Sequence, residues 1–157
     1  MDIKTVKLRS WQQAVYDEIE KHMEMRESEV YAGCSDYQIN RDLSIITAFP
    51  KGSGHSFLAN YIAATMPSIL VYKDLNHYTQ ATGNFPVHTQ TDALSIFEIF
   101  YALHKPDVRV PNPEYMEIRQ RMQSKRVTVV DNFMSLPQGI KDFLYESSSG
   151  IIIMLGH

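Results

Sequence analysis

Four short apolar runs, rich in β-branched residues, divide the chain and predict buried strands. They lie at about 43–49, 68–72, 126–131 and 150–155. Uninterrupted apolar runs of this length are typical of strands that are covered on both faces, as in parallel sheets. The segments between them carry helical spacing. The sequence therefore predicts an α/β fold in three layers, with a mainly parallel sheet between two layers of helices.

Capping signals and apolar positions that recur every three or four residues place the helices. Ser10 with Gln13, and Ser135 with Gln138, have the spacing of a capping box, in which two side chains bond to the first turn. Residues 24–42 are polar and irregular, which predicts a loop. Helices are expected at 10–29, at 57–66, at 92–104 after the capping residue Thr91, from Pro113 to about Gln123, and from Ser135 to about Tyr145.

Composition narrows the class of protein. The chain has 157 residues, a net charge of −3 and a pI near 6.0, which argues against a general nucleic-acid coat. Its single cysteine, Cys34, excludes an internal disulfide, and the six histidines lack the spacing of a zinc site. No apolar run approaches the ~20 residues of a membrane span. We expect one soluble, cytoplasmic domain over 1–157, with an N-terminal helix at about 10–29, a core at about 43–157 and no membrane partner.

A glycine-rich segment, Pro50-Lys51-Gly52-Ser53-Gly54-His55-Ser56, follows the first predicted strand and precedes a predicted helix. Such a loop turns successive backbone N–H groups toward a phosphate at the N-terminus of a helix. Gly52 and Gly54 supply backbone freedom, and Ser56 supplies a hydroxyl for Mg²⁺. The motif G-x-x-x-x-G-K-[ST] requires lysine where this chain has His55, which is shorter and mostly neutral at pH 7. The segment predicts a phosphate site that lacks its main cation.

Five segments, in order, resemble the first RecA-like domain of superfamily-two helicases and the related ATPase domain of viral terminase large subunits. They are Leu8-Arg9-Ser10-Trp11-Gln12, the glycine loop, Ile69–Tyr72 followed by Leu75 and Gln80, Val127–Asn132, and Ile151–His157. The resemblance implies a P-loop NTPase that takes ATP and Mg²⁺. It implies adenine recognition by Gln12, phosphate binding by Lys51, Gly52, Ser53, Gly54, His55 and Ser56, and Mg²⁺ binding by Ser56 and Asp131.

The chain departs from the pattern of this family at positions that are catalytic in the family. In the family an aspartate is followed by a glutamate that polarises the attacking water, and here Asn132 follows Asp131. An amide cannot accept the proton. The lysine is replaced by His55, although some terminase ATPases place a working lysine early in the loop, where this chain has Lys51. The pattern ends where a first helicase domain ends, without the second domain and its arginine finger. A complete single-chain motor is therefore not expected.

Three functions stay open at this point. The leading one is a weak nucleotide binder or pseudo-ATPase that docks on partner proteins in DNA processing or packaging. A second is an active ATPase that a partner or a homo-oligomer completes in trans. In the homo-oligomer, one subunit would contribute Arg119, Arg121 or Arg126 to the site of its neighbour. A third is an interaction module without nucleotide, in which Phe49 or His55 fills the space above the loop. A basic stretch is either a DNA contact or a solvated helix face: Lys105, Arg109, Arg119, Arg121, Lys125 and Arg126.

Overall fold

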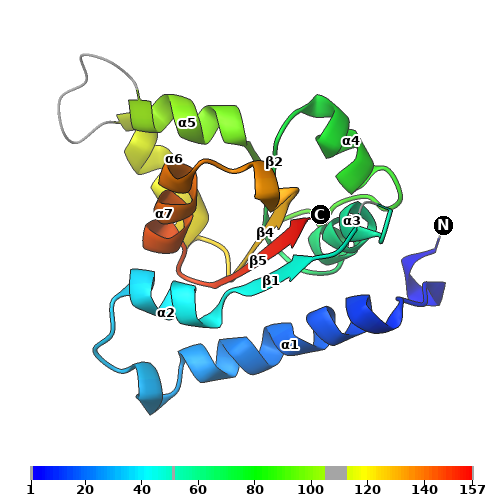
Figure 1. The fold of residues 1–157 in the computed structure, drawn as a ribbon, viewed down its shortest axis with the longest axis horizontal. Coiled ribbons are helices and arrows are strands. Elements are labelled where there is room, and N and C mark those ends of the chain that lie inside the picture. Colours follow the sequence, from blue (N-terminus) through cyan, green and yellow to red (C-terminus); the bar gives the residue numbers. More distant parts are fainter. Residues whose placement is uncertain (1, 51, 105–112, 157) are drawn as a thin grey trace.

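The computed structural model describes residues 2–50, 52–104 and 113–156, and a five-stranded, all-parallel sheet lies at its centre (Figure 1). The strand order is β1-β5-β4-β2-β3. This confirms the predicted α/β fold with its parallel sheet, and all four predicted strands are present. The strands are β1 (Ile45–Ala48), β2 (Ile69–Tyr72), β3 (Asp92–Ser95), β4 (Val127–Asp131) and β5 (Ile151–Gly156).

Helices cover both faces of the sheet, so the architecture is consistent with three layers. Alternate strand residues point into two separate apolar clusters, as Val129 and Val130 of β4 illustrate. One cluster includes side chains of α1–α4, and the other those of α5–α7. The helices are α1 (Ser10–Arg26), α2 (Asp36–Leu43), α3 (His55–Thr65), α4 (Leu75–Thr82), α5 (Ile96–His104), α6 (Pro113–Gln123) and α7 (Gln138–Ser147), with short 3₁₀ turns at Ile3–Thr5, Glu29–Tyr31 and Phe133–Ser135. No helix in the described part of the chain is long and apolar enough to cross a bilayer.

The fifth strand, β3, corrects one prediction, because Asp92–Ser95 was expected to begin a helix after Thr91. These residues instead pair in parallel with β2, and the helix begins only at Ile96. The Thr91 hydroxyl does not cap a helix; it donates to the carbonyl of Ala63 at 2.9 Å. Strand pairing therefore outweighs a local capping signal here.

Two further corrections concern helices. The stretch 24–42, expected to be a loop, contains α2, whose amphipathic face buries Ile39 and Leu43. The first helix ends at Arg26 rather than near residue 29. The capping box predicted at Ser10 does not form as proposed, and α7 begins at Gln138 rather than at Ser135. The N-cap of α1 is Arg9, whose N–H donates to the Gln12 side chain, and the N-cap of α7 is Pro137.

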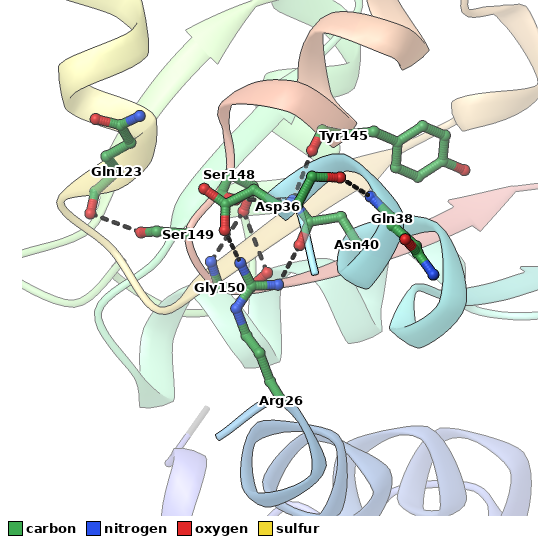
Figure 2. Close-up of polar contacts among 10 residues, drawn as sticks. Arg26, Asp36, Gln38, Asn40, Gln123, Tyr145, Ser148, Ser149 and Gly150 are labelled. Atoms are coloured by element: carbon green, nitrogen blue, oxygen red, sulfur yellow. Dashed lines mark hydrogen bonds and ion pairs between the residues drawn. The ribbon is translucent and has the colours of Figure 1, made fainter. Parts of the chain in front are cut away.

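A buried polar cluster joins α1, α2 and α7 near the amino ends of the strands (Figure 2). The Asn40 side chain is 2% exposed, and its Nδ2 donates to the carbonyls of Tyr145 and Ser148 at 2.6 and 2.7 Å. Its Oδ1 accepts from Arg26, which also pairs with Asp36 at 2.9 Å. Burial lowers the pKa of the Arg26 guanidinium, and the Asp36 carboxylate opposes that shift. We call this group the Arg26–Asn40 cluster.

Candidate phosphate-binding site

The glycine loop joins β1 to α3 at the carboxyl edge of the sheet, in the predicted order of strand, loop and helix. Gly52 and Gly54 have φ angles of +88° and +95°, a region that favours glycine. Gly54 is the N-cap of α3, so the first N–H groups of an 11-residue helix face the end of the loop. The N–H groups of a first helical turn and the helix dipole make this position favourable for an anion. Lys51 lies outside the described residues.

Side chains at the start of α1 hold the glycine loop in place by donating hydrogen bonds to backbone carbonyls of the loop. The Gln12 Nε2 donates to the Gly54 carbonyl at 3.0 Å, and the Trp11 indole donates to the Ser53 carbonyl at 3.2 Å. The Gln12 Oε1 accepts from the Arg9 backbone at 2.8 Å, and the residue is 3% exposed. Both ends of this amide therefore bond within the protein. Adenine recognition by Gln12 stays a prediction.

His55, at the position of the missing lysine, packs against aromatic side chains. Its ring centroid lies 5.2 Å from that of Trp11 and 6.1 Å from that of Phe49, and the residue is 6% exposed. The Phe49 backbone N–H lies 3.4 Å from His55 Nε2. Above Gly52, no described atom lies within 4 Å of where a Cβ would stand, whereas Gln12 Nε2 lies 2.7 Å from that point at Gly54. The space over the loop is thus open at Gly52 and filled at Gly54.

Ser56 and Asp131 meet beneath the loop, although they come from α3 and from the end of β4. The Ser56 hydroxyl donates to Asp131 Oδ2 at 3.0 Å, and Asp131 is 2% exposed. This contact brings together the two residues predicted as Mg²⁺ ligands. A hydroxyl and a carboxylate are the hard oxygen donors that Mg²⁺ takes, with phosphate oxygens and water completing its shell. Among described residues, no three His, Cys, Asp or Glu side chains gather as a metal site.

A pocket of about 240 Å³ opens beside this pair. Its lining includes Ser56, Asn76, His77, Gln80, Asp131 and Asn132. Another cavity, of about 290 Å³, lies at the opposite edge, where Met66, Pro67 and Val127 meet Ile19 and Met23 of α1. That larger cavity is mainly apolar and lies far from the glycine loop. The chemistry therefore favours the smaller pocket as the functional one.

The sequence analysis missed His77, which lines this pocket, and its partner Asp74. Asp74 caps α4 by accepting from the His77 backbone at 2.9 Å, and its Oδ1 lies 2.6 Å from His77 Nδ1. These hydrogen bonds lower the pKa of the Asp74 carboxyl. The other ring nitrogen, Nε2, lies 3.1 Å from Nδ2 of Asn132. An aspartate three residues before a histidine, at a helix start, is the local signal that was available.

Asn132 follows Asp131 directly and has a left-handed backbone, with φ of 61° and ψ of 50°. Asparagine tolerates this conformation better than most residues do. The turn ends β4 and sets the Asn132 amide toward α4, where it meets His77. The residue predicted to replace a catalytic glutamate therefore lies in the pocket, in contact with an imidazole.

The described residues of the predicted basic stretch lie away from the glycine loop, whereas the Arg9 guanidinium donates to the Ser53 carbonyl at 3.0 Å. Arg121 makes a two-point ion pair with Asp92 at 2.7 and 2.9 Å, which raises the pKa of the Arg121 guanidinium and lowers that of the Asp92 carboxyl. Arg126 pairs with Glu27 at 2.9 Å. Asp92 and Arg126 stand where parallel strands begin, at the edge opposite the loop. Arg119 is partly exposed on α6 and Lys125 borders the apolar cavity, while Lys105 and Arg109 lie outside the described residues.

The chain matches no protein-family model, and no curated protein is similar enough to count as a relative. The fold and the geometry of the pocket therefore carry the functional argument.

Proposed function

We propose that this protein is a degenerate P-loop NTPase domain that binds a nucleoside triphosphate weakly at the carboxyl edge of its sheet. The observation that carries the proposal is the Ser56–Asp131 hydrogen bond beneath the glycine loop. A hydroxyl at a helix start and a buried carboxylate at the end of another strand are the two protein groups that hold Mg²⁺ beside phosphates in such sites. Mg²⁺ there would neutralise charge on the triphosphate oxygens.

Hydrolysis by the isolated chain should be negligible. His55 packs against Trp11 rather than offering a fixed charge, and Asn132 cannot take a proton from water. Each group that stabilises charge in a transition state is commonly worth about 3–4 kcal/mol. Losing a cation and a carboxylate together would slow turnover by several orders of magnitude. Robust phosphate release from the purified chain, abolished in Asp131→Ala, would overturn this part of the proposal.

Nucleotide binding is testable by titration with ATP, ADP and a non-hydrolysable analogue, with and without Mg²⁺. Trp11 is the only tryptophan, and it contacts the loop through the Ser53 carbonyl and the His55 ring. Its fluorescence should therefore report occupancy of the loop. A signal that saturates with ATP and shifts to lower concentration with Mg²⁺ supports the proposal, and a flat signal opposes it.

The role would be to dock on partner proteins in DNA processing or packaging. The exposed face of α5 supports a protein partner, because Phe97, Phe100 and Tyr101 lie together on it and are 71%, 46% and 58% exposed. Acidic residues border Tyr101 in a shallow groove, which disfavours DNA there: Glu98, Glu114 and Glu117. Phe97→Asp should weaken co-purification with such a partner and leave ATP affinity unchanged. If the wild type and Phe97→Asp co-purify equally with the partner, the exposed face of α5 is not the docking surface.

Completion of an active ATPase in trans remains the second candidate. The Arg121–Asp92 and Arg126–Glu27 pairs stand at the edge opposite the glycine loop, so a working arginine from this region would have to come from another molecule. That candidate requires assembly that depends on nucleotide. A strict monomer in size-exclusion chromatography, with and without ATP and Mg²⁺, would exclude self-completion.

A further inference from the structure

The two edge strands of the sheet, β1 and β3, differ in how their outer edges are protected (Figure 1). An edge strand presents unpaired backbone N–H and C=O groups, which recruit another strand unless charged residues or proline prevent it. β3 begins with Asp92, which forms a two-point ion pair with Arg121. β1 reads Ile-Ile-Thr-Ala, without charge or proline. We propose that the outer edge of β1 is a dimer interface, on which β1 of a second copy of this chain pairs in antiparallel orientation.

The backbone of β1 determines which groups face this edge. Within the described residues β1 pairs with β5 alone, and the Phe49 N–H donates to the Gly156 carbonyl at 3.1 Å. Successive residues of a strand direct their backbone groups to opposite sides, so Thr47 and Phe49 face β5. Ile46 and Ala48 therefore face the outer edge, and each offers one N–H and one C=O to a neighbouring strand. An extended strand is the ligand that this edge fits.

The side chains of Ile46 and Ala48 form an apolar strip beside these backbone groups. Ile45 points into the apolar cluster shared with α1–α4, and alternation along the strand places Ile46 and Ala48 on the other face of the sheet. Ile46 is 52% exposed, and Ala48 is exposed as well. In an antiparallel pair centred on Thr47, Ile46 of each copy lies opposite Ala48 of the other. A large side chain then stands beside a small one, twice by symmetry, so the strip is complementary to itself.

The hydroxyl of Thr47 favours a second copy over an unrelated strand. Its Oγ1 atom is buried, on the face of the sheet that carries Ile45, and no described residue forms a hydrogen bond with it. A buried hydroxyl without a partner destabilises a fold. With the two-fold axis at Thr47, the same residue of the second copy stands directly opposite, in a pair whose Cα atoms lie about 4.5 Å apart. Threonines paired in this way hydrogen-bond across the strands, so each hydroxyl gains a partner.

The interface is small, and we therefore expect a weak dimer. Each Ile46–Ala48 pair would exchange both hydrogen bonds of an antiparallel pair, and the two sheets would join into one continuous sheet. The 4 residues of each β1 bury too little surface for a permanent complex, so association should depend on protein concentration. Nucleotide takes no part in these contacts. The dimer therefore differs from the nucleotide-dependent assembly that completion in trans requires.

Sedimentation velocity at low and high protein concentration tests the dimer. We expect the wild type to shift from monomer toward dimer between about 10 µM and about 500 µM, with or without ATP. Ile46→Lys places a charge on the edge, as natural edge strands do, and should weaken association at least about tenfold. Val30→Lys is the matched control, because Val30 is β-branched, is 72% exposed and lies outside the sheet, in the 3₁₀ turn Glu29–Tyr31. The control should associate as the wild type does.

Cross-linking tests the register of the two strands. In a Cys34→Ser background, Thr47→Cys should form an intermolecular disulfide on mild oxidation, because Cα atoms about 4.5–5.5 Å apart permit that bond. Ile46→Cys should cross-link far less, since the two copies of residue 46 stand diagonally, about 7–8 Å apart. Thr47→Val keeps the shape of the side chain and removes the hydroxyl. It should weaken association about two- to fivefold without lowering the unfolding temperature of the monomer. Circular dichroism establishes that each variant is folded.

Each outcome decides for or against the β1 dimer. A concentration-dependent dimer that Ile46→Lys weakens and Thr47→Cys cross-links supports the proposal. A strict monomer at both concentrations would overturn it and leave the edge to a strand of another protein. A dimer that Ile46→Lys and Val30→Lys leave equally intact would place the interface elsewhere, which also overturns it. A dimer that Ile46→Lys weakens but Thr47→Cys does not cross-link would overturn the antiparallel register. None of these results depends on nucleotide binding, so the proposed function can fail separately.

Discussion

Two polar clusters at opposite edges of the sheet use similar side chains in different ways. In the Arg26–Asn40 cluster, the buried Asn40 amide bonds at both ends, to Arg26 and to the carbonyls of Tyr145 and Ser148. In the pocket at the carboxyl edge, the Asp74–His77–Asn132 contacts and the Ser56–Asp131 contact border a cavity of about 240 Å³. The first cluster joins three helices around backbone carbonyls. The second leaves polar atoms beside a space that a ligand can enter.

The comparison separates stability from binding. A buried amide whose partners are all internal stabilises the fold, and its loss leaves several groups without hydrogen bonds. Polar residues around a pocket are held in position by one another, so that each contributes less to stability. We therefore expect variants at the amino edge to change the free energy of unfolding. Variants at the carboxyl edge should change ligand affinity.

The largest expected effect is that of Asn40→Ala. It removes the partner of Arg26 and of two backbone carbonyls in a buried site, so we expect a loss of about 3 kcal/mol in the free energy of unfolding. Chemical denaturation measures this loss. Gln38→Ala, on the exposed side of the same helix, is the control and should change stability by less than about 0.5 kcal/mol. If Asn40→Ala lowers the free energy of unfolding by no more than the control does, the cluster does not stabilise the fold.

The next effect is a gain in affinity. His55→Lys restores the cation of the motif, and a charge-assisted contact to the phosphates is worth about 1.5–3 kcal/mol, or roughly tenfold to a hundredfold in ATP affinity. The gain should shrink as salt rises, because the contact is ionic and partly exposed. Hydrolysis should stay poor, since Asn132 is unchanged. A folded variant without measurable nucleotide affinity would mean that the loop no longer adopts a phosphate-binding conformation.

A smaller effect is expected from Asp131→Asn. The amide oxygen can still accept from Ser56, so the fold should be retained, while the negative charge that attracts Mg²⁺ is lost. Binding of ATP should then become nearly independent of Mg²⁺, a loss of about tenfold relative to the wild type with the metal. Titrations with Mg²⁺ and with a chelator make the measurement. Unchanged metal dependence would show that Asp131 is only the polar end of a buried strand.

The smallest effect concerns the Arg121–Asp92 pair and its pH dependence. Hydrogen bonds from Arg121 lower the pKa of the Asp92 carboxyl, so the pair stabilises the fold above the unfolded pKa of ~3.9. That contribution disappears as pH falls through the lower, folded pKa. Because both side chains are about one third exposed, we expect Arg121→Gln to cost about 0.5–1 kcal/mol at pH 7. Unfolding curves at pH 7 and at successively lower pH should show the cost shrink as Asp92 becomes protonated in the folded state, and a constant cost would contradict the assignment.

The sequence located the sheet better than the site. Apolar runs such as 127–131 are buried on both faces, so composition alone marks them as strands. The edge strand Asp92–Ser95 has polar residues at both ends and follows Thr91, whose local signal is that of a helix cap. Its pairing with β2 is a tertiary effect that no local pattern shows. The helix α2 was missed because its apolar side consists mainly of Ile39 and Leu43 among polar residues.

The predicted site residues met with different outcomes. Ser56 and Asp131 were placed in one site by resemblance, and the parallel strands bring them together. The Asp74–His77 pair has only a weak local signal, and its partner Asn132 lies 55 residues away in the chain, so no spacing could reveal the contact. The orientation of His55 toward Trp11 and Phe49 depends on packing between α1 and the loop. That contact also lies beyond sequence patterns.

The most direct test of the account is a titration of the wild-type protein with ATP, followed by Trp11 fluorescence and by calorimetry, with and without Mg²⁺. The account predicts saturable binding in the millimolar range, a binding free energy of about 4 kcal/mol, that tightens with Mg²⁺ and releases no phosphate. If binding does not saturate up to about 10 mM ATP, the binding free energy is weaker than ~3 kcal/mol. That result would contradict the central claim that the carboxyl-edge pocket is a nucleotide site.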